Sequence, residues 1–214
     1  GGMWVFPGGR VDEADDPSTF APFCLHRTDE QASELMQMPA GALTYYVAAV
    51  REAFEEAGIL LALHRDTGRL LDLSEPETVR RFEAHRRDIN DSNRNFIELI
   101  EDENLILDVG TMHYIARWIT PVGPPRRYDT RFFITRMPAA QTPIHDDHEL
   151  VHAQWLTPAE ILRQFDSGAM TLMSPTLRML RCLARFTSAD EVMAAAAANQ
   201  PDERARVNAT GDIV

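Results

Sequence analysis

Residues 51–58 read Arg-Glu-Ala-Phe-Glu-Glu-Ala-Gly and form the most informative stretch of the chain. On a helix, Glu52, Glu55 and Glu56 lie at positions i, i+3 and i+4, so their carboxylates project from one face. Like charges placed in this way repel one another. A hard divalent cation would remove the repulsion, because Mg²⁺ and Mn²⁺ prefer oxygen ligands. Gly58 stands where a glycine commonly ends a helix. The alternative interpretation is an ordinary charged, solvated helix face.

A second stretch, Phe6-Pro7-Gly8-Gly9-Arg10, lies upstream. Together the two resemble the signature of the Nudix hydrolases. That signature is a glycine, five residues, a glutamate, seven residues, and then Arg-Glu, an apolar residue, any residue, Glu-Glu, any residue, a glycine and an apolar residue. The residues that stand as the signature has them are Arg51, Glu52, Glu55, Glu56, Gly58 and Ile59.

The first half of the signature departs from the family pattern. Gly9 is its glycine, but the residue that follows after five intervening residues is Asp15 instead of a glutamate. Asp15 and Arg51 are separated by 35 residues (51 − 15 − 1), where the signature has seven. We therefore interpret residues 16–41 as an insertion that splits the motif, which leaves the role of Asp15 open.

An insertion at this point resembles one branch of the family, which contains the peroxisomal coenzyme A diphosphatase of animals and its bacterial relatives. The stretches that fit this branch are residues 3–12, 51–61, 118–121 and 128–133. The likeness extends to about Pro158. It implies that the substrate is coenzyme A or an acyl-coenzyme A, cut to 4′-phosphopantetheine and 3′,5′-ADP.

The family resemblance implies an α/β fold, a Nudix-type α/β/α sandwich with a mixed sheet and helical insertions. We expect a single Nudix domain over residues 1–186, with insertions at 16–41 and 75–103, followed by a C-terminal helix and polar tail over 187–214. Because a Nudix fold needs a strand pair ahead of the first motif, we also expect further residues to precede Gly1.

Hydrophobic patterns and turn residues place the individual elements. Strands are predicted at 3–6, 59–63, 111–120, 128–137 and 149–156. Helices are predicted at 29–37, 43–57, 77–89, 92–100, 158–166, 175–186 and 188–199. Thr157 and Glu160 form a capping box at the start of one of them, with Pro158 in its first turn.

The resemblance implies metal ligation by Glu52, Glu55 and Glu56 and by the backbone carbonyl of Gly8. Arg51 lies one turn before Glu55, so it can pair with that carboxylate and fix its rotamer. Glu52 is the first candidate for the general base. Glu149, in the acidic segment 145–149, is the second. The catalytic set is therefore Glu52, Arg51 and Glu149. The alternative for the acidic segment is an exposed turn, and its histidines lack the spacing of a zinc site.

Substrate contacts are predicted from basic residues near the motifs. Arg127 and Arg131 flank Tyr128, so the guanidinium groups can bind phosphate while the ring packs against a base. Arg10, beside the glycines, is a further candidate for phosphate contact. The alternative is that the cluster near Tyr128 only places charges at a sheet edge.

Other substrates of the same reaction type are sugar nucleotides, NADH, ADP-ribose and dinucleoside polyphosphates. A nucleotide sensor that does not cut its ligand, or an interaction scaffold, would be a different class of protein.

Composition limits the partners. The chain has 214 residues and a formal net charge of −12, which argues against a nucleic-acid-binding surface. Its two cysteines fit a reducing compartment, and we expect a cytoplasmic protein. No run of apolar residues is long enough to span a membrane. The expected partner is a small nucleotide substrate, and the resemblance implies a homodimer.

Overall fold

The computed structural model describes residues 3–123, 125–143 and 154–198. Its α-helices are α1 (Pro17–Phe20), α2 (Asp29–Leu35), α3 (Leu43–Ala57), α4 (Pro76–Asn90), α5 (Phe96–Asp102), α6 (Pro158–Asp166), α7 (Ser174–Leu183) and α8 (Ala189–Ala198). Its strands are β1 (Ala62–His64), β2 (Leu105–Leu107), β3 (His113–Ile119) and β4 (Asp129–Ile134). Short 3₁₀ turns occur at Glu13–Asp15, Ala21–Phe23 and Val109–Thr111.

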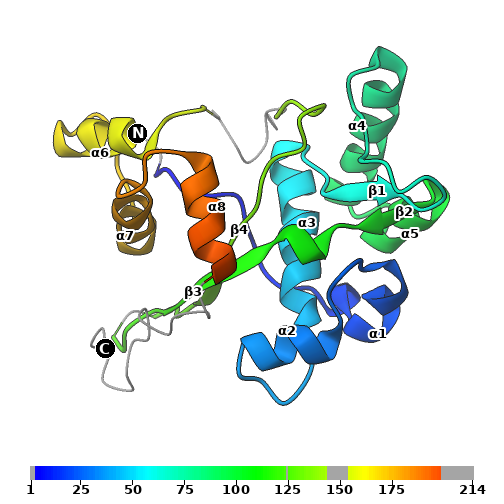
Figure 1. Ribbon diagram of the computed structural model, residues 1–214, viewed down its shortest axis with the longest axis horizontal. Coiled ribbons are helices and arrows are strands. Elements are labelled where there is room, and N and C mark those ends of the chain that lie inside the picture. The colour runs from blue at the N-terminus through cyan, green and yellow to red at the C-terminus, as the bar shows by residue number, and fades with distance from the viewer. Residues whose placement is uncertain (1–2, 124, 144–153, 199–214) are drawn as a thin grey trace. The chain divides into compact units, whose positions relative to one another are not determined.

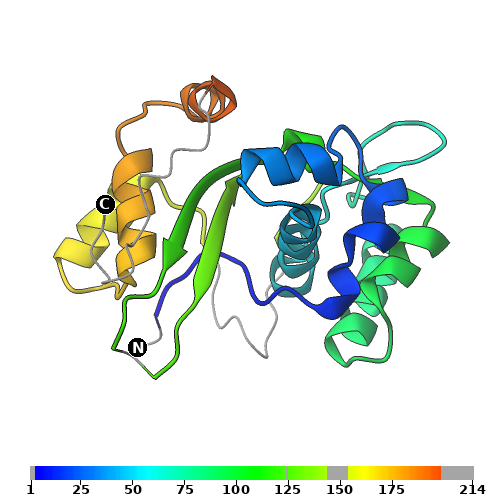
Figure 2. The same cartoon turned by 90° about the horizontal axis from the view of Figure 1, so that it is seen from below.

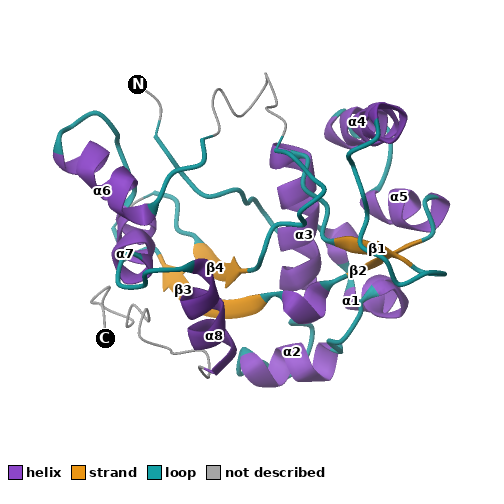
Figure 3. Cartoon of the chain, turned by 45° about the horizontal axis from the view of Figure 1, so that its top comes forward, coloured by secondary structure: helices purple, strands orange, loops and turns teal. Residues whose placement is uncertain are grey.

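The chain divides into two compact units, each described by itself. The helical unit comprises Pro7–His113 and Thr135–Ala153. The hairpin unit comprises Gly1–Phe6, Tyr114–Ile134 and Gln154–Val214. Figure 3 shows that helices and loops make up most of the helical unit. None of the described helices combines the length and the apolar character needed to cross a membrane.

The helical unit is built around α3, which runs alongside the β1–β2 pair (Figure 1). The residues of α3 that are almost wholly buried follow a helical period: Leu43, Tyr46, Val47, Val50 and Phe54. The helix ends at Gly58, whose φ of +68° lies in the left-handed region that favours glycine. The predicted helix over 43–57 is therefore confirmed.

The strands of the helical unit pair in both senses. β1 and β2 are antiparallel, with Leu63 opposite Ile106 at the centre of the register. An isolated antiparallel bridge joins Leu63 to Leu70, and an isolated parallel bridge joins Cys24 to Leu107. The parallel bridge brings the region of the predicted insertion 16–41 to the edge of β2.

Aromatic side chains from distant parts of the sequence pack together beside α3. The Phe20 and Phe96 rings stack with their centroids 5.9 Å apart. The Phe96 and Phe54 centroids are 6.4 Å apart. Phe20 belongs to α1 and Phe96 to α5, so both predicted insertions contribute to the core around the motif helix.

The hairpin unit contains β3 and β4, which lie side by side in Figure 2, and the mutually packed helices α6 and α7. Its core gathers Ala116 and Trp118 of β3 with Met179 of α7, and Phe132 of β4 packs against them. Thr157 and Glu160 form the capping box predicted at the start of α6, because each side chain accepts the other's backbone N–H.

The structure corrects several predicted strands. Residues 3–6 form only a bridge between Trp4 and Leu172, instead of a strand. In 59–63 the strand starts only at Ala62, because the N–H and carbonyl of Leu60 bond to the side-chain amide of Gln141 at 2.9 Å each. The sequence did not predict β2. Of the predicted strand 149–156, residues 149–153 lie outside the described residues, and 154–156 form no strand.

Candidate functional site

Arg51 joins the two halves of the split motif. Its side chain is only 10% exposed, and its Nε lies 2.9 Å from Asp15 Oδ1. Its Nη1 lies 2.9 Å from Glu52 Oε1 and 2.9 Å from Glu55 Oε2. Its Nη2 donates to the backbone carbonyl of Arg10 at 2.7 Å. The predicted pair between Arg51 and Glu55 is therefore present, and it is one contact of a larger buried network.

Asp15 is the member of this network whose role the sequence left open. Its residue is only 1% exposed. Its Oδ2 accepts from Arg51 Nη2 at 3.1 Å and from the backbone N–H of Asp12 at 2.8 Å. Two contacts to one guanidinium define its orientation. Asp15 thus reaches Arg51 despite the long insertion between them, and its spacing from Gly9 was the signal that could have identified it.

The glycine-rich bend lies against the carboxylates of α3. Gly8 has a φ of +151°, in the region that glycine tolerates best. Its N–H donates to Glu56 Oε2 at 2.9 Å. A Cβ placed on Gly9 would overlap the carboxylate of Glu52. Gly8 thus suits the backbone conformation of the bend, and Gly9 leaves room for the Glu52 carboxylate in its present position.

Negative charge exceeds positive charge in this network. Burial alone lowers the pKa of the Arg51 guanidinium, but the hydrogen bond and charge of Asp15, with the charges of Glu55 and Glu52, raise it overall. Burial also raises the pKa of Glu55, and Arg51 only partly offsets this, while Glu52 and Asp15 add to it. A further cation beside Glu55 would favour its ionised form.

The donor atoms fit a hard divalent cation in their chemistry. They are carboxylate oxygens beside a bend in which a Cβ would fill the space next to Glu52. Each carboxylate already has a protein partner, however, since Glu52 and Glu55 both contact Arg51 and Glu56 accepts from the N–H of Gly8. In the described part of the chain, no three His, Cys, Asp or Glu side chains form a group that could hold a metal ion.

The predicted substrate residues are divided between the two units. Arg10 is in the helical unit, where its side chain is exposed and its carbonyl binds Arg51. In the hairpin unit, Tyr128 is 56% exposed and Arg127 Nε donates to the Thr120 carbonyl at 2.8 Å. The side chain of Arg131 is only 7% exposed and lies 3.5 Å from Asp129. The exposed pair Arg127 and Tyr128 is thus better placed to meet a ligand than Arg131.

The second candidate for the base, Glu149, lies outside the described residues, as does the whole acidic segment 145–149. Glu52, the first candidate, lies in the network of Arg51.

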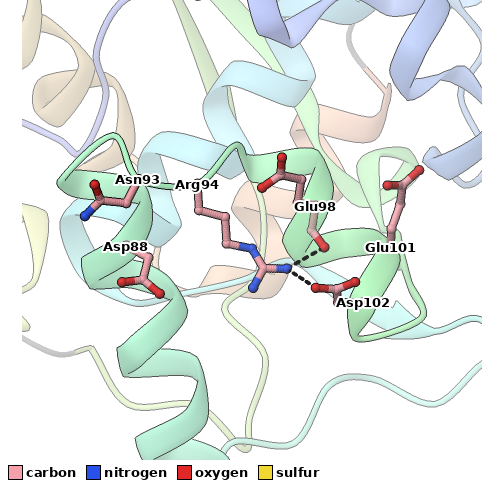
Figure 4. A pocket seen from close by; sticks show the side chains of 6 residues that line it. All are labelled: Asp88, Asn93, Arg94, Glu98, Glu101 and Asp102. Atoms are coloured by element: carbon pink, nitrogen blue, oxygen red, sulfur yellow. Dashed lines mark hydrogen bonds and ion pairs between the residues drawn. The ribbon is translucent and has the colours of Figure 1, made fainter.

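An open hollow of about 560 Å³ lies between α4 and α5, away from the motif residues. It is lined by Asp88, Asn93, Arg94, Glu98, Glu101 and Asp102 (Figure 4). Arg94 donates to the carbonyl of Glu98 and to the carboxylate of Asp102. Because its one guanidinium is already bonded to protein oxygens and most of its lining is acidic, this hollow is poorly suited to an anionic phosphate.

Arg86, which lies near the site, is marked by no motif in the sequence. Arg86 of α4 is 7% exposed. Its Nε and Nη2 donate to the backbone carbonyls of Glu55 and Glu56, each at 2.7 Å. Its position 30 residues after Glu56 and among other arginines gave no reason to choose it.

Comparison of the sequence with those of known proteins identifies its relatives. The family described as the NUDT19 Nudix domain matches residues 16–183. The chain is 30% identical to the human acyl-coenzyme A diphosphatase NUDT19, over 89% of this chain and 58% of that protein. The chicken protein of the same name is 28% identical, over 88% of this chain and 58% of that protein. The chain thus spans under two thirds of the length of these curated relatives.

A solved structure shares the fold. The crystal structure of a Nudix hydrolase from Alicyclobacillus acidocaldarius superposes with a TM-score of 0.71 and covers 90% of this chain and 81% of that one, at 24% sequence identity. The predicted α/β fold of Nudix type is therefore confirmed. The family match covers more than half of the chain, including the residues of the Arg51 network from α3. This chain belongs to the Nudix hydrolase family, in the group that carries the NUDT19 Nudix domain.

Proposed function

We propose that this chain hydrolyses the diphosphate bond of coenzyme A or an acyl-coenzyme A, with a divalent metal ion as cofactor. The network that joins Asp15, Arg51, Glu52 and Glu55 carries the proposal, because it holds the acidic face of α3 beside the glycine bend. The names of the curated relatives support the substrate. Among the alternatives, NADH, ADP-ribose and dinucleoside polyphosphates would require the same bond cleavage.

The chemistry assigns separate tasks to the residues. A water oxygen forms a bond to one phosphorus atom, while the bond from that phosphorus to the bridging oxygen breaks. Glu52, or Glu149, would take the proton of the water. Arg51 holds Glu52 and Glu55 in place. Arg10 of the helical unit is proposed to contact the substrate, and so are Arg127 and Tyr128 of the hairpin unit. Arg131, the remaining predicted substrate residue, lies 3.5 Å from Asp129 and would have to exchange that contact to bind a phosphate.

Glu52, Glu55 and Glu56, with the carbonyl of Gly8, would hold the metal. Nudix hydrolases generally require a divalent metal ion, and the oxygen donors here favour Mg²⁺ or Mn²⁺. When bound, such an ion supplies positive charge to the phosphate oxygens. To accept it, the carboxylates must exchange part of their present contacts with Arg51 and Gly8.

A substrate screen with product mass spectrometry tests the proposal. With Mg²⁺ or Mn²⁺, we expect coenzyme A to give 4′-phosphopantetheine and 3′,5′-ADP. Glu55→Gln and Glu56→Gln should lower turnover by orders of magnitude with little loss of folding, while Glu13→Gln, an exposed acid nearby, serves as the control. Preferred cleavage of NADH or ADP-ribose would replace the substrate assignment. Binding of a nucleotide without cleavage would favour a sensor.

We further propose that residues 1–186 form one Nudix domain, with a helix and tail at 187–214. The family match over 16–183 supports this, since it includes segments of both compact units.

We also propose a cytoplasmic homodimer that binds neither nucleic acid nor membranes. Both cysteines are free, and burial raises the pKa of the Cys24 thiol to about 12, which keeps it unreactive. The mass of the protein in solution tests the dimer.

A further inference from the structure

We propose that Arg86 is a positioning residue for the metal ligands Glu55 and Glu56. It would act from α4, in the helical insertion, by holding the backbone at the end of α3. This inference rests on the proposed function, because it assumes that these two carboxylates bind a metal ion.

The contact is a fork across two successive peptide groups. Arg86 Nε lies 2.7 Å from the carbonyl oxygen of Glu55, and Nη2 lies 2.7 Å from that of Glu56. Asn90, one turn further along α4, adds a contact of 3.4 Å from its Nδ2 to the Glu55 carbonyl. Because a guanidinium is planar and rigid, two such bonds fix both carbonyls relative to α4.

The first two backbone N–H groups after α3 bond to carbonyls other than these two. The N–H of Gly58 donates to the carbonyl of Phe54 at 2.9 Å, and the N–H of Ile59 donates to that of Ala53 at 3.2 Å. The left-handed conformation of Gly58 then turns the chain out of the helix. The carbonyls of Glu55 and Glu56 belong to the last turn, where a helix lacks further N–H groups. Arg86 supplies those donors, and its charge also suits the negative end of the helix dipole.

Fixing these peptide groups limits the directions in which the two side chains leave the helix. The carboxylate of Glu55 reaches Arg51, and that of Glu56 reaches the N–H of Gly8. Last turns of helices open easily unless they are anchored. Without Arg86, both carboxylates would sample a wider range of positions, and a metal ion would have to order them upon binding. Arg86 therefore contributes to metal affinity without contacting the metal.

The test compares Arg86→Ala and Arg86→Lys with Arg87→Ala. Arg87 is an exposed residue of the same helix and provides the matched control. Mn²⁺ affinity is measured without substrate by calorimetry, alongside hydrogen exchange of peptides covering residues 53–59. We expect Arg86→Ala to weaken Mn²⁺ binding about tenfold or more and to speed exchange at the end of α3. Arg86→Lys, which cannot form the fork, should fall between it and the parent. Arg87→Ala should match the parent.

The outcomes separate this inference from the proposed function. If the parent binds Mn²⁺ and hydrolyses its substrate, but a folded Arg86→Ala protein binds Mn²⁺ equally well, the positioning role is refuted and the function stands. If Arg86→Ala does not fold, the lysine variant decides by the same comparison. If the parent itself fails to bind Mn²⁺, the metal-dependent function and this inference both fail.

Discussion

Asp15 shows how one short side chain can retain a contact across an insertion. It stands where the Nudix signature has a glutamate, one methylene longer. Its backbone lies in a 3₁₀ turn, Glu13–Asp15, that brings the carboxylate within 2.9 Å of Arg51 Nε. The same carboxylate accepts the N–H of Asp12, so the turn and the ion pair support one another. The position of the main chain thus compensates for the shorter side chain.

Asp15→Ala should destabilise the protein by about 3 kcal/mol, because it leaves the buried Arg51 guanidinium without its main partner. Urea unfolding at neutral pH measures this change. The exposed neighbour Glu13, changed to Gln, should alter stability by less than about 0.5 kcal/mol. Equal stability of the parent and the Asp15 variant would mean that Glu52 and Glu55 suffice to hold Arg51.

At the scale of elements, a cluster of charged side chains, called here the anchor, joins α4 to the end of α5 within the helical insertion. Glu103, just after α5, accepts from Arg81 Nε at 2.7 Å and contacts His85 Nε2 at 3.0 Å, and both partners belong to α4. Burial raises the pKa of Glu103, but the hydrogen bonds from Arg81 and His85 lower it overall. Because α4 also carries Arg86, this anchor bears on the end of α3.

The lowered pKa gives the anchor a defined pH dependence. The folded state binds a proton at Glu103 more weakly than the unfolded chain does, so the contribution is fully present above the unfolded pKa, near 4.5. It is lost as the pH falls through the lower folded value. Glu103→Gln should cost about 0.5–1 kcal/mol at pH 7, a modest value because Arg81 is nearly half exposed and solvent screens the pair. The difference from the parent should shrink in urea titrations as the pH falls below about 4.5.

Glu101→Gln provides the comparison for this experiment, since Glu101 is exposed on α5. It should show no such pH-dependent difference. A Glu103→Gln effect of constant size from pH 7 to pH 3 would assign the loss to packing instead of charge.

For the whole molecule, the net charge of −12 attracts cations to the surface in general, so the effect of a metal ion at the site must be separated from this background. A metal ion that binds only the folded state raises its stability by mass action, by about 2.7 kcal/mol at a concentration one hundred times its dissociation constant. Thermal unfolding with added Mn²⁺ should show this increase. NaCl at matched ionic strength should not reproduce it, and the double variant Glu55→Gln, Glu56→Gln should lose most of it. An undiminished increase in that variant would place the stabilising ion elsewhere.

The sequence predicted those features of the whole molecule that local patterns encode. The apolar period from Leu43 to Phe54 predicted α3, and Thr157 with Glu160 predicted the start of α6. Contacts between distant residues were not predictable in this way. The side chain of Gln141 replaces a strand partner at Leu60, and no local pattern announces such a substitution. The contact of Arg86 with the end of α3 was equally unpredictable, because it depends on how α4 packs against α3.

The ion pair between Asp15 and Arg51 also dictates an order of assembly. It links positions 36 apart in the sequence, so forming it requires closure of a long loop and its loss of chain entropy. The stacking of Phe20 on Phe96 forms later, since it needs a helix synthesised later still. A nascent chain that ends soon after Gly58 would carry every glutamate of the motif without the scaffold that orients them. The hydrolytic centre of this protein would then mature only after most of the helical unit has emerged and folded.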